Sequence, residues 1–216
     1  MSDSGRALEE DLKWREAELA SLKLLVVDAA SGTVRQQVLL RALCTLLYAH
    51  YEGFCKFAWD YYLDSLEKTE ALRKDCVDKI AKASLKKAFK EIQGDLSLEG
   101  IWDLCTSAFP SLMLGKLEFS VRLETKSNLS PSLLAENSSS IGLACAVVRT
   151  HEVKLRSLVA RRNEIAHGRK MLISTLAEYQ DYENAAVAAM HELAISVIEV
   201  LESKAYLSSN SGPAPD

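Results

Sequence analysis

Proline and glycine are scarce in this sequence, with 4 and 9 copies among 216 residues. Because these residues mark the turns of sheets built from short strands, their scarcity argues against an all-β fold and favours a mostly helical one. Hydrophobic residues make up 48% of the chain and charged residues 26%, which is ordinary for a soluble globular protein. A chain of this length buries a substantial core in one domain and leaves little room for a second.

A signal sequence and an uninterrupted apolar segment are also missing. Residues 1–13 are polar and acidic, unlike a signal peptide, which has a basic start and an apolar centre. The richest apolar run, residues 38–47, is interrupted by Arg41. We therefore expect no membrane span and a cytoplasmic location.

Cysteine and histidine follow no disulfide or metal-binding pattern. The five cysteines are odd in number, are never spaced C-x-x-C and lie mostly in apolar helical patterns. They are Cys44, Cys55, Cys76, Cys105 and Cys145. None of the four histidines pairs with carboxylates or thiols at ligand spacing. We expect reduced core thiols, no metal and no other cofactor.

Apolar residues recur at helical spacing through most of the chain. The predicted helices span residues 6–29, 33–66, 69–92, 143–167 and 174–207. The second is long and strongly apolar, with Thr33 as a plausible N-cap, and is the expected spine of the fold. The predicted fold class is therefore all-α, an up-and-down bundle of four to five main helices.

Two segments depart from this helical pattern. Residues 94–142 form a looser insert, in which Ser130 is expected to cap a brief helix that starts at Pro131. Residues 208–216, rich in serine and proline, are expected to be a disordered tail. The predicted organisation is a single helical domain over residues 1–207.

The predicted helix over residues 69–92 is unusually basic. Seven basic residues stand against four acidic ones, and the basic ones are Arg73, Lys74, Lys79, Lys82, Lys86, Lys87 and Lys90. Such a run is either an ordinary solvated face or a track for a phosphate backbone. Because Phe89 is its only aromatic residue, stacking on single-stranded bases is not supported there.

The stretch RRNEIAHG over residues 161–168 combines an arginine and a histidine five positions apart at the end of a helix that closes in glycine. On a helical wheel Arg162 falls in the middle of an apolar line formed by Val147, His151, Leu155, Leu158 and Ile165. A buried charge is costly without a partner. Arg162 must therefore meet a carboxylate, a polar cleft, a second subunit or a ligand phosphate.

Three further residues are candidates for the surroundings of Arg162. Asn163 and His167 form an i, i+4 pair on one edge of the apolar line. In the spine helix, Tyr48 and Glu52 share a face, and Glu52 is a carboxylate in a strongly apolar segment. Glu52 is either a surface or capping charge or the partner of Arg162 on the facing helix.

A bare arginine and histidine at this spacing is weak evidence, since chance produces it often. The motif here is, however, preceded by apolar residues, contains Asn163 and closes in glycine. In these features it resembles the motif of the HEPN superfamily, whose members carry R-polar-x-x-x-H on an inward-facing helix. The string LLYAHYEGFCK within the spine helix is similar to the first core helix of stand-alone bacterial HEPN proteins. The resemblance thus spans most of the chain and extends to RiboL-PSP-type and related HEPN domains.

The resemblance implies a metal-independent endoribonuclease, a hydrolase of toxin-antitoxin or antiphage defence systems, acting as a homodimer whose two motifs face one cleft. Cleavage would proceed by attack of a 2′-hydroxyl on the adjacent phosphate. Arg162 would stabilise the phosphorane oxygens, His167 would move a proton and Asn163 would orient either group. RNA would be captured by Arg161, Arg169 and Lys170. An antitoxin or defence partner protein is also implied.

Other interpretations stay open at this point. His167 is also explained as a polar residue at a helix C-terminus, and Arg161 and Arg169 as surface charges. HEPN toxins modified by a partner nucleotidyltransferase carry a tyrosine two residues after the motif histidine, where this chain has Arg169. The net charge of −4 speaks against avid nonspecific RNA binding. The alternative is a noncatalytic HEPN module that binds nucleotide, RNA or protein.

Overall fold

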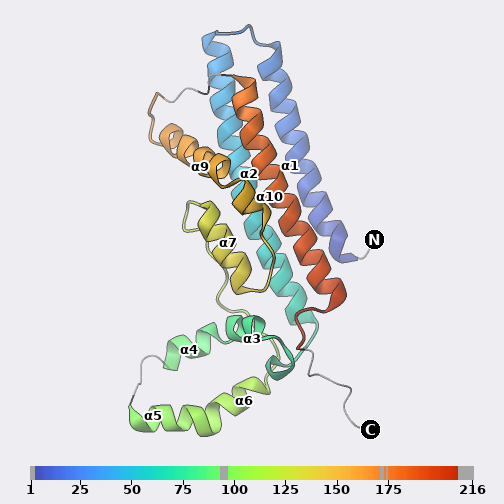
Figure 1. The fold of residues 1–216 in the computed structure, drawn as a ribbon, viewed down its shortest axis with the longest axis vertical. Helices are drawn as coiled ribbons and strands as arrows, with labels where there is room; N and C mark the ends of the chain where they lie inside the picture. The colour runs from blue at the N-terminus through green and yellow to red at the C-terminus, as the bar shows by residue number, and fades with distance from the viewer. Residues whose placement is uncertain (1–2, 93–96, 171–172, 174, 209–216) are drawn as a thin grey trace.

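Three long helices form the body of the molecule (Figure 1). The computed structural model describes residues 3–92, 97–170, 173 and 175–208. The long helices are α1 (Asp3–Asp28), α2 (Val34–Lys68) and α10 (Leu176–Ser203). Helices α1 and α2 form a hairpin, and α10 packs against both. The part of the chain that the structure describes contains no strand, only two isolated bridges, so the predicted all-α fold is confirmed.

Helix α2 is the spine because its apolar side chains are buried over most of its length. Its N-cap, Thr33, accepts a hydrogen bond from the N–H of Gln36, which fixes the start of the helix. Its largest fully buried side chains are Trp59, Tyr48, Tyr51, Tyr62 and Phe54. The indole of Trp59 donates to the hydroxyl of Ser138 at 3.1 Å, which ties α7 (Pro131–Ser140) to the spine. As predicted, Ser130 caps α7.

Helix α10 begins after Thr175, whose side chain accepts a hydrogen bond from the N–H of Glu178. By length and composition alone this helix could cross a membrane. That is weak evidence, because the central helix of a globular fold meets the same criteria. Here α10 packs against α1, α2 and the motif helix α9 (Glu152–Ala166). The expected absence of a membrane span stays a prediction.

The prediction of one helix over residues 69–92 is wrong. The segment folds as a 3-10 turn and two short helices: η1 (Arg73–Asp75), α3 (Asp78–Ser84) and α4 (Lys86–Ile92). The N–H of Val77 donates to the carbonyl of Tyr206, and the N–H of Arg73 donates to that of Gly115. These bonds to distant segments replace the i to i−4 bonds of a continuous helix. The basic residues therefore do not share one face.

The prediction of one helix over residues 143–167 is also wrong. A short helix, α8 (Val147–Thr150), is separated at His151 from α9 (Glu152–Ala166). The carboxylate of Glu192 on α10 accepts hydrogen bonds from the N–H groups of Ala146 and Val147, both at 2.8 Å. These bonds cap the N-terminal end of α8 and fix it to α10. The motif itself lies wholly on α9 and its C-terminal end.

The insert carries a projecting arm at the lower end of Figure 1. The arm consists of α5 (Leu98–Asp103), a π-helical turn η2 (Leu104–Ala108) and α6 (Phe109–Met113), and none of its residues is buried. Exposed apolar residues on or beside the arm include Leu98, Trp102 and Leu114.

A polar cluster is buried between α1 and α2. The guanidinium of Arg15 contacts Asp11 at 2.5 Å and the ring of His50 at 3.4 Å, and His50 contacts Glu18 at 2.9 Å. The ring of Trp14 meets that of His50 edge to face. Burial, and secondly the charge of Arg15, hold the pKa of His50 below its usual value, although Glu18 and Asp11 act in the opposite direction.

This cluster predicts a loss of stability in mild acid. Because the unfolded chain binds a proton at His50 more readily than the folded chain, stability falls as pH drops below about 6.5. We expect the melting temperature of His50→Gln to decline less than that of the wild type between about pH 7 and pH 5. His191→Gln is the matched control, because His191 also contacts a glutamate, Glu16 at 2.7 Å, but is half exposed. Parallel melting curves for wild type and His50→Gln would contradict the prediction.

Candidate functional site

The end of α9 has a defined cap that fixes the place of His167. Gly168 adopts a left-handed φ of 71° and donates its N–H to Ile165, while the N–H of Arg169 donates to Glu164. These two bonds form a Schellman motif, which needs a residue free to adopt positive φ. His167 is the last residue before the glycine and is exposed. The glycine-closed helix end is thus present as predicted.

Arg162 lies half buried where α9 crosses α2. The carboxylate of Glu52 lies 3.7 Å from its Nη2, and the ring centre of Tyr48 lies 4.2 Å from its guanidinium carbon. The guanidinium also donates to the Oδ1 of Asn163 at 2.9 Å and to the carbonyl of Ser127 at 3.4 Å. Its side chain retains 25% of its exposure, so it is not closed off from solvent.

Tyr48 provides a rigid platform for this arginine. Its ring is buried, and its hydroxyl oxygen accepts a hydrogen bond from the N–H of Leu129 at 2.7 Å. Burial raises the pKa of Tyr48 to about 12, so the phenol is neutral at physiological pH. A neutral ring face attracts a guanidinium by its quadrupole. Tyr48 therefore orients Arg162 without taking part in an ion pair.

Glu52 and Asn163 complete the surroundings of Arg162. Glu52 is partly buried, and one of its oxygens, Oε1, is buried without a hydrogen-bond partner in the described part of the chain. The separation of 3.7 Å to Arg162 is an ion pair with loose geometry. Asn163 directs its side-chain oxygen to Arg162, whereas only its backbone carbonyl accepts a bond from His167. The arrangement therefore orients the arginine more tightly than the histidine.

Two of the three predicted substrate-binding cations have partners within the chain. Arg161 donates to a carboxylate oxygen of Glu178 at 3.0 Å. Arg169 donates to both oxygens of Glu164 at 2.8 and 3.1 Å. Lys170 is exposed at the end of the motif. The positive charge available to a ligand beside Arg162 is therefore smaller than the sequence indicates.

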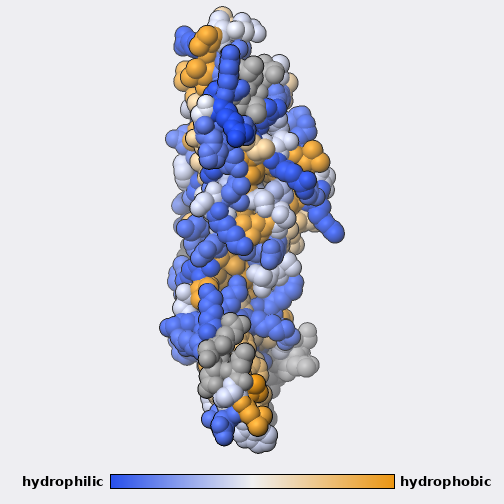
Figure 2. Space-filling model, turned by 90° about the vertical axis from the view of Figure 1, so that its left-hand side faces the viewer, coloured by the Kyte–Doolittle hydropathy of each residue, from blue (hydrophilic) through white to orange (hydrophobic). Residues whose placement is uncertain are grey.

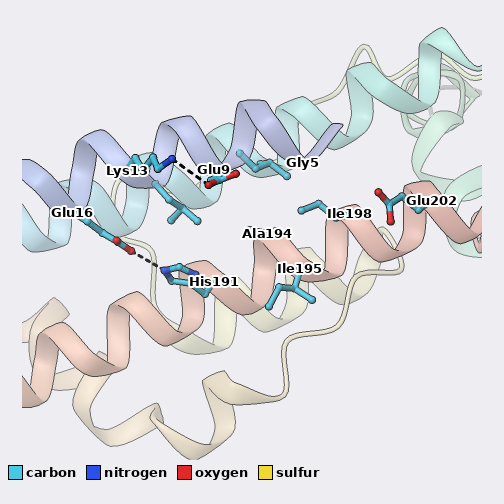
Figure 3. Close-up of a pocket in the computed structure, with 11 residues that line it drawn as sticks. Gly5, Glu9, Lys13, Glu16, His191, Ala194, Ile195, Ile198 and Glu202 are labelled. Carbon is cyan, nitrogen blue, oxygen red and sulfur yellow. Dashed lines mark hydrogen bonds and ion pairs between the residues drawn. The ribbon is translucent and has the colours of Figure 1, made fainter. Parts of the chain in front are cut away.

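A groove of about 690 Å³ lies elsewhere, between α1 and α10 (Figure 3). Its floor contains apolar residues such as Leu12 and Ile198, and its rim carries three carboxylates, those of Glu9, Glu16 and Glu202. No motif residue lines it. Lys13 of the same lining pairs with Glu9, and His191 contacts Glu16, so the groove offers a phosphate no unpaired lysine or arginine and does not suit RNA.

Within residues 3–92, 97–170, 173 and 175–208, no group of three or more His, Cys, Asp or Glu side chains is placed to hold a metal ion. All five cysteines are free thiols, and Cys44, Cys55 and Cys76 are buried. Burial raises the pKa of Cys44, so this thiol is not a nucleophile at neutral pH.

One part of the site escaped the sequence analysis, namely the segment around Ser127. Lys126 and Ser127 both adopt left-handed backbone conformations, with φ of 52° and 58°. The turn they form brings the carbonyl of Ser127 to Arg162. The Ser-Asn pair in this segment is a turn signal, but it does not reveal which helix the turn contacts.

An inward-facing arginine, oriented by a carboxylate and a tyrosine ring, and a histidine at the end of the same helix define an all-α RxxxxH domain. The chain belongs to the HEPN family. It matches the family described as MAE_28990-like HEPN over residues 5–206, from α1 to the end of the last helix. The resemblance seen in the sequence is thereby confirmed. No curated protein and no solved structure matches the chain. HEPN domains are typically ribonucleases.

Proposed function

We propose that this protein is a metal-independent endoribonuclease that cuts RNA by attack of a ribose 2′-hydroxyl on the adjacent phosphate. The observation that carries the proposal is the half-buried guanidinium of Arg162, held by three protein groups and still partly open to solvent. An oriented cation of this kind stabilises charge that develops in the transition state without reorganising. Membership of the HEPN family adds to this support.

The proposed reaction forms a bond between O2′ and phosphorus and breaks the bond between phosphorus and O5′. His167 takes the proton of the 2′-hydroxyl or returns one to the leaving 5′-oxygen, since an imidazole has one nitrogen that accepts and one that donates a proton. Arg162 binds the two nonbridging oxygens as their charge grows. Asn163 and Tyr48 hold the guanidinium in place.

We expect cleavage of total RNA by the purified protein to persist in EDTA and to leave 2′,3′-cyclic phosphate or 3′-phosphate ends. The reason is that arginine and histidine supply the charge and the proton transfer for which other nucleases use a metal ion. The ends are read by their resistance to ligation and by mass spectrometry, with His167→Ala as the blank. Strict dependence on added magnesium or manganese, or a 5′-phosphate product, would reject this mechanism.

A biological role in toxin-antitoxin or antiphage defence, with a partner protein that restrains or activates the nuclease, is proposed from the family alone. The second candidate function is a noncatalytic module that binds RNA, nucleotide or another protein. The pairing of Arg161 with Glu178 and of Arg169 with Glu164 favours it, because these arginines are already neutralised. Retained RNA binding without cleavage would identify this second function.

A further inference from the structure

A second cavity, of about 510 Å³, lies against α2 beside the motif. One wall is the segment 120–127, and the other is formed by Lys56 of α2. We refer to it as the Lys56 groove. It adjoins Arg162 directly, because Ser127, at the end of the lining segment, accepts a hydrogen bond from the Arg162 guanidinium. The groove is therefore continuous with the candidate site.

The segment 117–129 forms this wall because it runs along α2 in the opposite direction. The N–H of Phe119 donates to Glu67 at 2.5 Å, and Arg122 pairs with Asp64 at 2.6 Å. Farther along, the N–H of Leu129 donates to Tyr48. Four of the five apolar members of the segment are buried: Leu117, Phe119, Leu123 and Leu129. A segment anchored at both ends makes the groove a formed feature of the fold.

Successive turns of α2 line the path from the motif into the groove. Tyr48, Glu52 and Lys56 follow one another at four-residue steps, which places them on one face of the helix. The first two contact Arg162, and the third opens into the groove. A ligand held at Arg162 that follows this face therefore reaches Lys56 next.

The charges in the groove are suited to a polyanion. Lys56 and Lys126 are exposed, and neither lies within ion-pair distance of a carboxylate in the described part of the chain, whereas Arg122 is already paired with Asp64. Glu124 is the one carboxylate among the lining residues. Lysine ammonium groups bind phosphates as point charges and need no bidentate geometry.

The residues that line the groove also indicate which parts of such a ligand they recognise. None of the residues that line the groove is aromatic, so bases have no surface for stacking. Hydroxyl groups of Ser120 and Thr125 and backbone groups of the turn are present instead. Contacts of this kind address phosphate and sugar rather than base edges. The expected recognition is of a single-stranded backbone without strong sequence preference.

We propose that the Lys56 groove binds the sugar-phosphate backbone of single-stranded RNA next to the phosphate held at Arg162, through Lys56 and Lys126. This proposal rests on the proposed ribonuclease function, which it extends by naming where the flanking nucleotides lie. It also places the RNA path away from the basic residues of α3 and α4, for which the sequence left a phosphate track open as one of two interpretations.

The test compares charge-reversal variants that are all made in a protein whose motif has been inactivated. In a His167→Ala background, Lys56→Glu combined with Lys126→Glu should weaken binding of a labelled oligonucleotide on the order of tenfold or more at low salt. The slope of log affinity against log salt should fall by about 0.7 for each lost phosphate contact. Lys87→Glu combined with Lys90→Glu makes the same charge change on α4 and should alter the affinity by less than about twofold.

A kinetic measurement on the protein with an intact motif separates the binding of flanking nucleotides from the cleavage step. The Lys56 and Lys126 reversals should raise KM for an oligonucleotide of about ten nucleotides and leave kcat unchanged, because they act on flanking phosphates. Cleavage of a dinucleotide, which is too short to enter the groove, should be unchanged. Glu124→Gln should tighten binding of the longer RNA.

The possible outcomes separate the two proposals. If the reversals leave binding of the longer RNA intact while Arg162→Ala abolishes cleavage, the groove proposal is overturned and the nuclease stands. If the wild type cuts no RNA but the reversals still weaken binding, the nuclease is overturned and the groove stands. Equal losses from the α4 control would overturn the groove in favour of diffuse attraction. Competition by polyglutamate as effective as that by RNA would overturn RNA as the ligand.

Discussion

Replacing Arg162 with lysine is expected to reduce RNA cleavage almost as far as replacing it with alanine, with each variant losing a factor of about 10² or more in kcat/KM. The guanidinium stacks on Tyr48, donates to Asn163 and Ser127 and faces Glu52 at the same time. A lysine ammonium has neither the planar face nor the fork of donors for these contacts. It would be left half buried beside Glu52 and turned away from the phosphate.

His167→Ala should cause a similar loss, because a positioned general acid or base contributes on the order of 10² or more to the rate. His167 is exposed and its backbone bonds do not involve the ring, so this variant should keep the wild-type melting temperature. Arg156→Ala is the matched control, since Arg156 is an exposed arginine of the same helix that pairs with Glu152. Near wild-type cleavage by Arg162→Lys or His167→Ala would remove the nuclease assignment from this site.

The long helices were predictable because each carries many turns of one apolar pattern. Both ends of helix α2 lie within two residues of the predicted bounds. The reason is that Thr33 supplies a local cap and that the aromatic residues of the helix repeat at helical spacing. The break at His151 was not predictable. The short helix before it is held by Glu192, a residue more than 40 positions away, which caps the N–H groups of Ala146 and Val147. Nothing in the local sequence records that contact.

The candidate site was predictable to the same extent and for the same reason. The wheel of its own helix gives the inward direction of Arg162, and it leaves Glu52 as one of two open interpretations, a surface charge or the partner of Arg162; the two meet at 3.7 Å. The role of Ser127 depends on two left-handed residues in an irregular segment, which periodicity does not describe. The partners of Arg161 and Arg169 were missed because a wheel gives direction but no distance.

The second prediction with a large effect on cleavage concerns dimerisation, since HEPN domains typically dimerise. The sequence suggested that Arg162 would need either an internal carboxylate or a second copy of the chain. It has the carboxylate, Glu52, so the arginine alone does not demand a dimer. The separation of the two motif residues still favours one. His167 follows Arg162 by about 140° around the helix and about 7.5 Å along it, so the side chains diverge within one copy.

We propose that Arg162 of one copy and His167 of its partner act on the same phosphate. Mixing two inactive proteins, Arg162→Ala and His167→Ala, should then restore cleavage to about a quarter of the wild-type rate, because random pairing yields half heterodimers, each with one complete site. The measurement is the cleavage rate after the mixed subunits have exchanged, plotted against the mixing ratio. If the site lies within one copy, every mixture stays inactive.

The position of the dimer interface provides a structural test of the proposal that two copies share one cleft. A shared cleft requires contact at the end of the bundle that carries α9, which Figure 1 places near the tip of the α1–α2 hairpin and away from the lower arm. Figure 2 shows hydrophobic residues at both ends of this face. Val34 and Val38 are exposed by 77% and 58% at the tip, and Trp102 by 68% on the arm.

Val34→Glu combined with Val38→Glu should therefore abolish dimer sedimentation and cleavage together, because it places charges in an apolar contact. Trp102→Glu should leave both unchanged. If the arm variant alone dissociates the dimer, the two motifs lie at opposite ends of the assembly and no cleft is shared.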